Sequence, residues 1–257
     1  MAGFIIVPLI MIFFYGLSGQ EGGFTLKNMA LISDSINRKA LLLSLGLSLL
    51  STLICLILAY PLAMILINTK MKSNSFIVLI IILPMWMNFL LRTIAWQNIL
   101  EKTGILNSIL KFLHMPTVNI INTSSAIVLG MVYNFLPFMV LPIYNVLIKI
   151  DKDVINAARD LGANGIQTFR KIIFPLSLPG VISGITMVFV PSLTTFVIST
   201  ILGGSKIVLI GNVIEQQFRL DNWHTGSGLS LVLMIFILLS MAVLSKYDKG
   251  SEDSNLW

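Results

Sequence analysis

The chain has 257 residues and a formal net charge of +6, with 56% hydrophobic and only 11% charged residues. Soluble domains contain about 45–50% apolar and about 25% charged residues, so one soluble core cannot bury this much apolar surface. The composition excludes soluble enzymes, nucleic-acid-binding modules, disordered chains and disulfide scaffolds, and it indicates a protein that lies in membrane lipid. The Lys and Arg residues are scattered between apolar runs, which is typical of basic loops beside membrane helices.

Six apolar runs follow one another along the chain, at residues 2–17, 40–67, 76–100, 124–148, 178–202 and 228–245. A helix of about 20 residues spans the hydrocarbon of a bilayer, so each run predicts a transmembrane helix. The first run is short enough for a signal peptide, but it has no basic start and no small-residue cleavage site, so we interpret it as a membrane helix. The runs together predict an all-α membrane protein with six transmembrane helices in a single domain, 1–257.

Prolines interrupt the second, third, fourth and fifth of these runs, at Pro61, Pro84, Pro137, Pro142 and Pro191. Proline removes a backbone donor and kinks a helix, and membranes tolerate this where neighbouring helices or a water-filled cavity satisfy the freed carbonyl groups. The prolines therefore indicate a bundle that contains a pathway, although single prolines are also common in ordinary membrane helices.

The charge of the connecting segments predicts the orientation of the chain. With the N-terminus in the cytoplasm, the inner segments 68–75, 149–177 and 246–257 contain nine Lys and Arg residues, and the outer segments contain seven. Cytoplasmic loops carry the excess of basic residues, so both termini are predicted to be cytoplasmic. Arg92 lies toward the outer end of the third run, and we expect its side chain to extend to the membrane surface beside Trp96.

The longest polar segment, 149–177, predicts a short helix, a turn and a second helix on the cytoplasmic side. Asp151 or Asp153 can cap the start of the first helix, and Gly162 suits its end. Asn164 can cap the second helix, and we expect Pro175 to end it. The first helix has one apolar face, with helical spacing, formed by Val154, Ala157, Ala158 and Leu161. Small side chains on this face favour either insertion into a groove of a partner protein or packing on the chain's own bundle.

The same segment resembles a known signature. Ala157-Ala158, Gly162, Ile172 and Phe174-Pro175 have the spacing of the EAA signature of ABC-importer permeases, Glu-Ala-Ala-x3-Gly-x9-Ile-x-Leu-Pro. This chain departs from the signature at Asn156, which replaces the glutamate, and at Phe174, which replaces the leucine. The resemblance implies a loop that contacts a separate ATPase through Asn156, Ala157, Ala158, Arg159, Asp160, Gly162 and Pro175. Because the glutamate is absent, we expect Arg159 and Asp160 to share its contact.

Further segments resemble one branch of this family, the spermidine/putrescine permeases of the PotB type. They are residues 83–86 with 91–92, residues 132–144, residues 157–163 with 167–169, and residues 209–214 with 217–218. The resemblance implies a MetI-like type I importer fold in the bacterial cytoplasmic membrane. It also implies a second permease subunit, a dimer of ATPase subunits and an extracytoplasmic binding protein as partners. Permeases for thiamine, iron, sulfate or opines share the loop, so another small solute remains the alternative substrate.

The chain contains no GxxxxGK[ST] loop, so ATP and Mg are expected on the partner ATPase, and we expect no cofactor or metal on this chain. The membrane runs also contain no Asp or Glu, although a polycation favours carboxylates. We therefore expect an external protein or the partner permease to recognise the substrate. This chain offers neutral oxygens and aromatic rings, with Glu215 near the outer mouth. The candidate pathway residues are Trp86, Asn88, Tyr133, Asn134, Asn212 and Glu215.

Three alternatives accompany this interpretation. Each aromatic pathway candidate can instead face lipid or pack in the core. A stand-alone channel or ion-coupled carrier requires a selectivity ring or ionisable residues inside the membrane. A membrane-embedded enzyme requires a catalytic set of side chains, and the sequence offers no such pattern.

Overall fold

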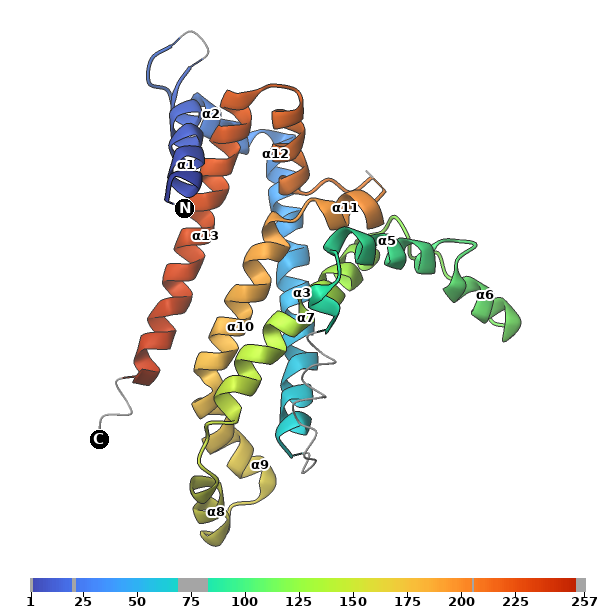
Figure 1. The fold of residues 1–257 in the computed structure, drawn as a ribbon, viewed down its shortest axis with the longest axis vertical. Helices are drawn as coiled ribbons and strands as arrows, with labels where there is room; N and C mark the ends of the chain where they lie inside the picture. The colour runs from blue at the N-terminus through green and yellow to red at the C-terminus, as the bar shows by residue number, and fades with distance from the viewer. Residues whose placement is uncertain (1, 20–21, 69–82, 205, 253–257) are drawn as a thin grey trace. The chain divides into compact units, whose positions relative to one another are not determined.

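The computed structural model describes residues 2–19, 22–68, 83–204 and 206–252 (Figure 1). Within these ranges, four helices are long and apolar enough to cross a membrane. They are α3 (Ser35–Asn68), α7 (Ser124–Leu147), the continuous helix Gly165–Thr194 and α13 (Trp223–Glu252). The apolar helix α1 (Ala2–Leu17) is shorter.

Shorter helices connect these elements. They are α2 (Lys27–Ala30), α5 (Phe89–Leu100), α6 (Ile105–Phe112), α8 (Lys152–Asp160), α11 (Val197–Leu202) and α12 (Ile210–Arg219). The continuous helix Gly165–Thr194 consists of α9 (Gly165–Thr168), a π-helical segment at Phe169–Ile173 and α10 (Phe174–Thr194).

The third apolar run is not a single helix in its described part, 83–100. A helical turn at residues 83–86 ends at Met87, whose N–H donates to the carbonyl oxygen of Pro84 at 3.2 Å. Asn88 then accepts hydrogen bonds from the backbone N–H groups of Leu90 (2.9 Å) and Leu91 (3.2 Å) through its side-chain oxygen. Such an N-cap starts a new helix, so the run is divided between Met87 and Asn88.

The fifth run is also divided. Helix α10 ends at Thr194, and α11 begins at Val197. The carbonyl oxygen of Phe196 accepts hydrogen bonds from the side chains of Thr200 at 2.8 Å and Asn212 at 3.2 Å. Side-chain donors thus satisfy backbone groups at the division, which keeps the break between the helices stable in an apolar region.

Contacts divide the chain into two compact units, each built from three separate stretches. Unit 1 contains Met1–Leu49, Thr93–Gly130 and Leu193–Ser240, and unit 2 contains Leu50–Arg92, Met131–Ser192 and Met241–Trp257. In unit 1, α1 packs against α13, where the rings of Tyr15 and His224 meet edge to face with their centres 5.4 Å apart.

In unit 2, α7 and α10 approach each other through glycines. A Cβ atom at Gly180 would lie 2.7 Å from the carbonyl oxygen of Pro142, and one at Gly184 would lie 2.7 Å from the sulfur of Met139. Larger side chains at these two positions would force the helices apart. Helices α8 and α9 join α7 and α10 at one end of this pair (Figure 1).

Candidate functional site

The first helix of the 149–177 segment, α8, has well-defined ends. Asp151 caps its start by accepting a hydrogen bond from the N–H of Asp153 at 2.9 Å. At its end, Gly162 has φ +83, and its N–H donates to the carbonyl oxygen of Arg159 at 2.9 Å. The N–H of Ala163 donates to the carbonyl oxygen of Ala158 at 3.0 Å, which completes a Schellman motif. The predicted caps at Asp151 and Gly162 are confirmed.

The second helix starts where the sequence predicted. The side chain of Asn164 accepts from the N–H of Gln167 at 2.8 Å, and the N–H of Asn164 donates to the side chain of Gln167 at 3.0 Å. This reciprocal pair is a capping box. The turn between α8 and α9 is therefore held from both sides by local hydrogen bonds.

The prediction that Pro175 ends this second helix is wrong. The helix continues from Gly165 to Thr194, and Pro175 lies inside it. The π-helical segment Phe169–Ile173 ends two residues before the proline. A local change from α to π hydrogen bonding accommodates a residue that has no N–H to donate. The segment 149–177 therefore passes into a membrane helix without interruption.

The apolar face predicted on α8 is only partly packed. Ala158 is buried, whereas Val154, Ala157 and Leu161 are exposed, with Leu161 at 90%. Ile166 on α9 is 78% exposed. Large apolar side chains on an otherwise polar segment are typical of a surface that becomes buried against another protein. The polar candidates beside this surface, Asn156, Arg159 and Asp160, are also exposed.

A cluster of four residues fixes the π-helical segment to α3. We call it the Tyr60 cluster; it consists of Tyr60, Phe169, Phe174 and Ser177. The Ser177 hydroxyl donates to the carbonyl oxygen of Phe174 at 2.8 Å, so the Tyr60 hydroxyl, 2.6 Å from it, is the donor in their shared hydrogen bond. The ring centre of Tyr60 lies 5.5 Å from that of Phe169 and 6.1 Å from that of Phe174.

Four candidate pathway residues lie in unit 2, near a contact between α5 and α7. They are Trp86, Asn88, Tyr133 and Asn134. The rings of Phe89 and Phe135 stack with their centres 6.3 Å apart, which brings the start of α5 beside α7. Asn134 is buried, whereas Trp86, Asn88 and Tyr133 are exposed. The oxygen of Asn88 also serves as the cap of α5, so its role in the fold is established independently of any pathway.

The other two candidates, Asn212 and Glu215, lie on α12 in unit 1. The Asn212 oxygen accepts from the Ser199 hydroxyl at 2.5 Å and from the N–H of Leu209 at 3.0 Å. Its NH₂ group donates to the carbonyl oxygen of Phe196 at 3.2 Å and to the hydroxyl of Thr200 at 2.9 Å. This amide therefore connects α11 to α12.

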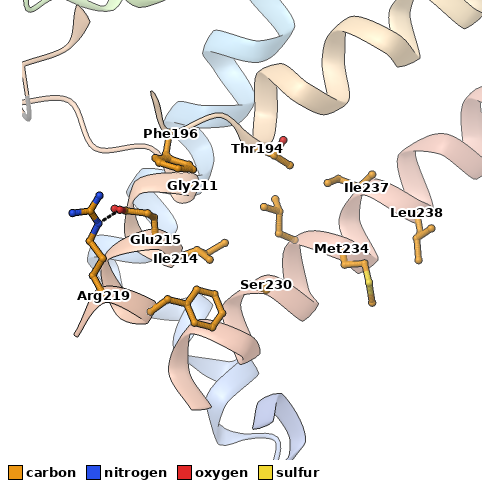
Figure 2. Close-up of a pocket in the computed structure, with 12 residues that line it drawn as sticks. Thr194, Phe196, Gly211, Ile214, Glu215, Arg219, Ser230, Met234, Ile237 and Leu238 are labelled. Atoms are coloured by element: carbon orange, nitrogen blue, oxygen red, sulfur yellow. Dashed lines mark hydrogen bonds and ion pairs between the residues drawn. The ribbon is translucent and has the colours of Figure 1, made fainter. Parts of the chain in front are cut away.

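Glu215 borders a cavity of about 690 Å³ between α12, α13 and the end of α10. Figure 2 shows its carboxylate paired with the guanidinium of Arg219, one helical turn later on α12. The remaining lining is mainly apolar, as at Ile214, Met234 and Ile237. The carboxylate predicted at the outer mouth thus has an ion-pair partner on its own helix.

The expectation that Arg92 extends to the membrane surface is wrong. Arg92 is only 6% exposed, and its Nη1 donates a hydrogen bond to the carbonyl oxygen of Pro84 at 2.6 Å. Side chains on a helix point back toward its N-terminus, and here the preceding turn supplies an acceptor in that direction. Neither this burial nor the Tyr60 cluster has a signal in the sequence, because both depend on contacts between separate elements.

Residues 2–247 match the family described as binding-protein-dependent transport system inner membrane component. The chain belongs to this family. Members of this inner membrane component family are parts of transport systems and not enzymes, and the apolar helices identify this member as a multi-pass membrane protein.

Two relatives of this family member are spermidine/putrescine transport system permease proteins PotB. The protein from Escherichia coli is 40% identical over 223 residues, which cover 86% of this chain and 81% of the relative. The protein from Haemophilus influenzae is 33% identical over 256 residues, which cover 96% and 89%. These identities confirm the resemblance seen in the sequence.

A solved bacterial ABC transporter involved in the import of the acidic polysaccharide alginate contains a chain with the same fold. The TM-score is 0.81 at 15% identity, over 96% of this chain and 90% of that chain. The likeness establishes an ABC-importer permease fold.

Proposed function

We propose that this chain is a membrane-spanning permease subunit of an ATP-driven ABC importer that carries polyamines into the cell. The observation that carries the proposal is the 149–177 segment, which presents an exposed apolar surface and continues directly into a membrane helix. The polyamine substrate is supported by 40% identity to a spermidine/putrescine permease.

The proposed complex contains this chain, a second permease subunit, two ATPase subunits and an extracytoplasmic binding protein. ATP and Mg bind on the ATPase chains. The exposed residues of α8, with Ala157 at the centre beside the buried Ala158, dock on an ATPase subunit. Asn156, Arg159 and Asp160 supply polar contacts. The departure from the glutamate of the signature makes Asp160 the acidic member of this contact.

Movement of the ATPases reaches the membrane through the continuous helix Gly165–Thr194. Because the turn at Gly162 and Asn164 is held by caps, α8 and α9 move together as the ATPase subunits close. The Tyr60 cluster ties the start of this helix to α3. One displacement at α8 therefore tilts two membrane helices.

The proposed topology has six transmembrane segments with both termini in the cytoplasm. The four long helices account for four of them, α1 for the first, and the run that contains α5 for the third. This arrangement places the 149–177 segment on the cytoplasmic side, where the ATPase subunits lie.

The proposed path for the polyamine uses neutral acceptors and aromatic rings, since the membrane runs contain no carboxylate. Its candidate residues in unit 2 are Trp86, Asn88, Tyr133 and Asn134, and its candidate residues in unit 1 are Asn212 and Glu215. Affinity and selectivity then reside mainly in the binding protein. Weak contacts along the path suit transport, because a substrate must leave each site as readily as it enters.

The test is uptake of labelled spermidine by the complete complex reconstituted in vesicles with ATP inside. We expect uptake that depends on ATP and on the binding protein, with putrescine but not sulfate as a competitor. ATP-dependent uptake of another small solute, such as thiamine, iron, sulfate or an opine, in place of spermidine would establish the alternative importer. Uptake by this chain alone, without the ATPase, would establish a channel or carrier instead.

A further inference from the structure

Arg92 is the only charged residue in the apolar run 76–100. It is 6% exposed, and among the described residues its guanidinium has one acceptor, the carbonyl oxygen of Pro84. Its Nε atom is buried and has no hydrogen-bond partner within the described part of the chain. A guanidinium has five N–H donors and keeps its charge in proteins, so one neutral acceptor leaves most of its hydrogen-bonding capacity unused.

The helix that carries Arg92 adds to the positive electrostatic potential around the guanidinium. Arg92 lies in the first turn of α5, a helix of 12 residues, and that turn contains no acidic residue. The N-terminus of a helix has a partial positive charge, which favours anions and disfavours cations. The bond from Arg92 to Pro84 shows that the guanidinium points back toward this terminus. Two positive features thus converge beside the turn 83–86.

The described chain does not supply a counter-ion. Residues 35–100 contain no Asp or Glu at all, and the next acidic residue, Glu101, lies at the opposite end of α5. At about 1.5 Å per residue, Glu101 is about 13 Å from Arg92 along the helix axis. Among the described residues, Arg219 and Glu215 on α12 form an ion pair, and Arg92 has no part in it. A buried charge without a partner strongly destabilises a protein, so this guanidinium calls for an anion from outside the described residues.

We propose that Arg92 and the N-terminus of α5 form an anion site that receives one carboxylate side chain of the second permease subunit when the two subunits assemble. The inference rests on the proposed function, which requires a second permease. The planar fork formed by Nε and an Nη atom matches a carboxylate in a bidentate pair. Reaching Nε requires the side chains over it to move on assembly, and the exposed neighbours Trp86 and Met87 lie in the adjacent turn.

A partner carboxylate fits this site better than the other anions and cations of a membrane transporter. A lipid phosphate brings a headgroup and two acyl chains, whereas a carboxylate on one partner side chain needs room for only two oxygens beside Arg92, which is 6% exposed. The polyamine itself is a cation, and an unpaired guanidinium would repel it. Pairing with a carboxylate therefore also removes a positive charge from a segment that we place beside the path.

The test begins with Arg92→Leu in the complete complex, with Arg38→Leu as the matched control. Arg38 is an exposed arginine at the start of α3, where the same substitution removes a solvated charge. We expect Arg92→Leu to reduce recovery of the second permease subunit with this chain by about tenfold or more, because it leaves the partner's carboxylate unpaired. Arg38→Leu should leave recovery unchanged.

Rescue distinguishes a pair from a folding defect. Each Asp and Glu in the membrane segments of the second subunit is changed to Asn or Gln in combination with Arg92→Leu. We expect one of these changes to restore assembly, since removal of both charges leaves neither unpaired.

Wild-type recovery for Arg92→Leu, or failure of every partner change to restore it, would overturn the proposal. So would loss of a bound anionic phospholipid, measured by native mass spectrometry, from an Arg92→Leu complex that keeps its second subunit. Spermidine uptake by the wild-type complex is measured separately, so these outcomes leave the proposed function untouched.

Discussion

Replacing Tyr60 with phenylalanine removes one hydroxyl from the Tyr60 cluster and leaves the ring in place. The hydroxyl donates to Ser177 over 2.6 Å, and both residues are buried. Such a neutral hydrogen bond contributes about 0.5–1.5 kcal/mol. Because 1.4 kcal/mol corresponds to about tenfold in an equilibrium constant, we expect a two- to twelvefold weaker link between α3 and the π-helical segment.

Replacing Tyr60 with leucine removes the ring contacts as well. Each of the two aromatic contacts, with Phe169 and Phe174, is worth about 0.5–1.5 kcal/mol beyond its area. Together with the hydrogen bond, the loss is about 1.5–4.5 kcal/mol. The two variants therefore form a graded series in which the leucine variant is the more severe.

The assay compares ATP hydrolysis by the reconstituted complex with and without the binding protein and spermidine. We expect the stimulated-to-basal ratio to fall in the order wild type, Tyr60→Phe, Tyr60→Leu, while basal hydrolysis and assembly are kept. Tyr144→Phe is the matched control, since the Tyr144 hydroxyl on α7 makes no hydrogen bond with a described residue. A wild-type ratio in both Tyr60 variants, or an equal loss in Tyr144→Phe, would refute a role of this cluster in transmission.

Three further predictions test the 149–177 segment and the proposed polyamine path. Gly162→Val places a β-branched residue at φ +83, which costs about 1–2 kcal/mol, so stimulated hydrolysis should fall while membrane insertion survives. Gly165→Ala is its control, because a Cβ there meets open space. Asp160→Ala should weaken co-purification of the ATPase more than Asn156→Ala, because charge-assisted contacts are worth about 1.5–3 kcal/mol against about 0.5–1.5 for neutral ones; equal losses would contradict this. Tyr133→Leu should slow spermidine uptake several-fold, since a cation–aromatic contact is worth about 2 kcal/mol or less; unchanged uptake would place the path elsewhere.

The caps and turns of the 149–177 segment could be predicted from the sequence. Asp151, Gly162 and Asn164 satisfy backbone groups within three residues of themselves, so their roles depend only on neighbouring sequence. The division of the third run also has a local signal, because Asn88 follows Pro84 and precedes an apolar helical stretch. The continuous hydropathy of the run nevertheless predicts a single helix, because it is the stronger of the two signals.

Features that join distant elements could not be predicted. Tyr60 and Ser177 are 117 residues apart in the chain, and no periodic pattern connects them. The sequence predicts Asn212 as an acceptor for substrate, and in the structure its amide makes hydrogen bonds to four groups on or beside α11 and α12. An amide in an apolar region needs partners in either role, so its residue type alone does not distinguish a fold contact from a pathway contact.

The order of two connections within the 149–177 segment leads to a last prediction. A displacement of α8 must first cross the turn at Gly162 and Asn164, and it must then pass the π-helical segment held by the Tyr60 cluster. Two connections in series are not independent, because once the first transmits no movement, weakening the second has no further effect. A complex with both Gly162→Val and Tyr60→Leu should therefore show the same stimulated-to-basal ratio as Gly162→Val alone, provided that the single variant abolishes stimulation. Independent sites would instead add their free energies and multiply their losses. Measuring the four members of this cycle in one preparation decides between the two, and multiplied losses would show that movement reaches α3 by a route that bypasses α8.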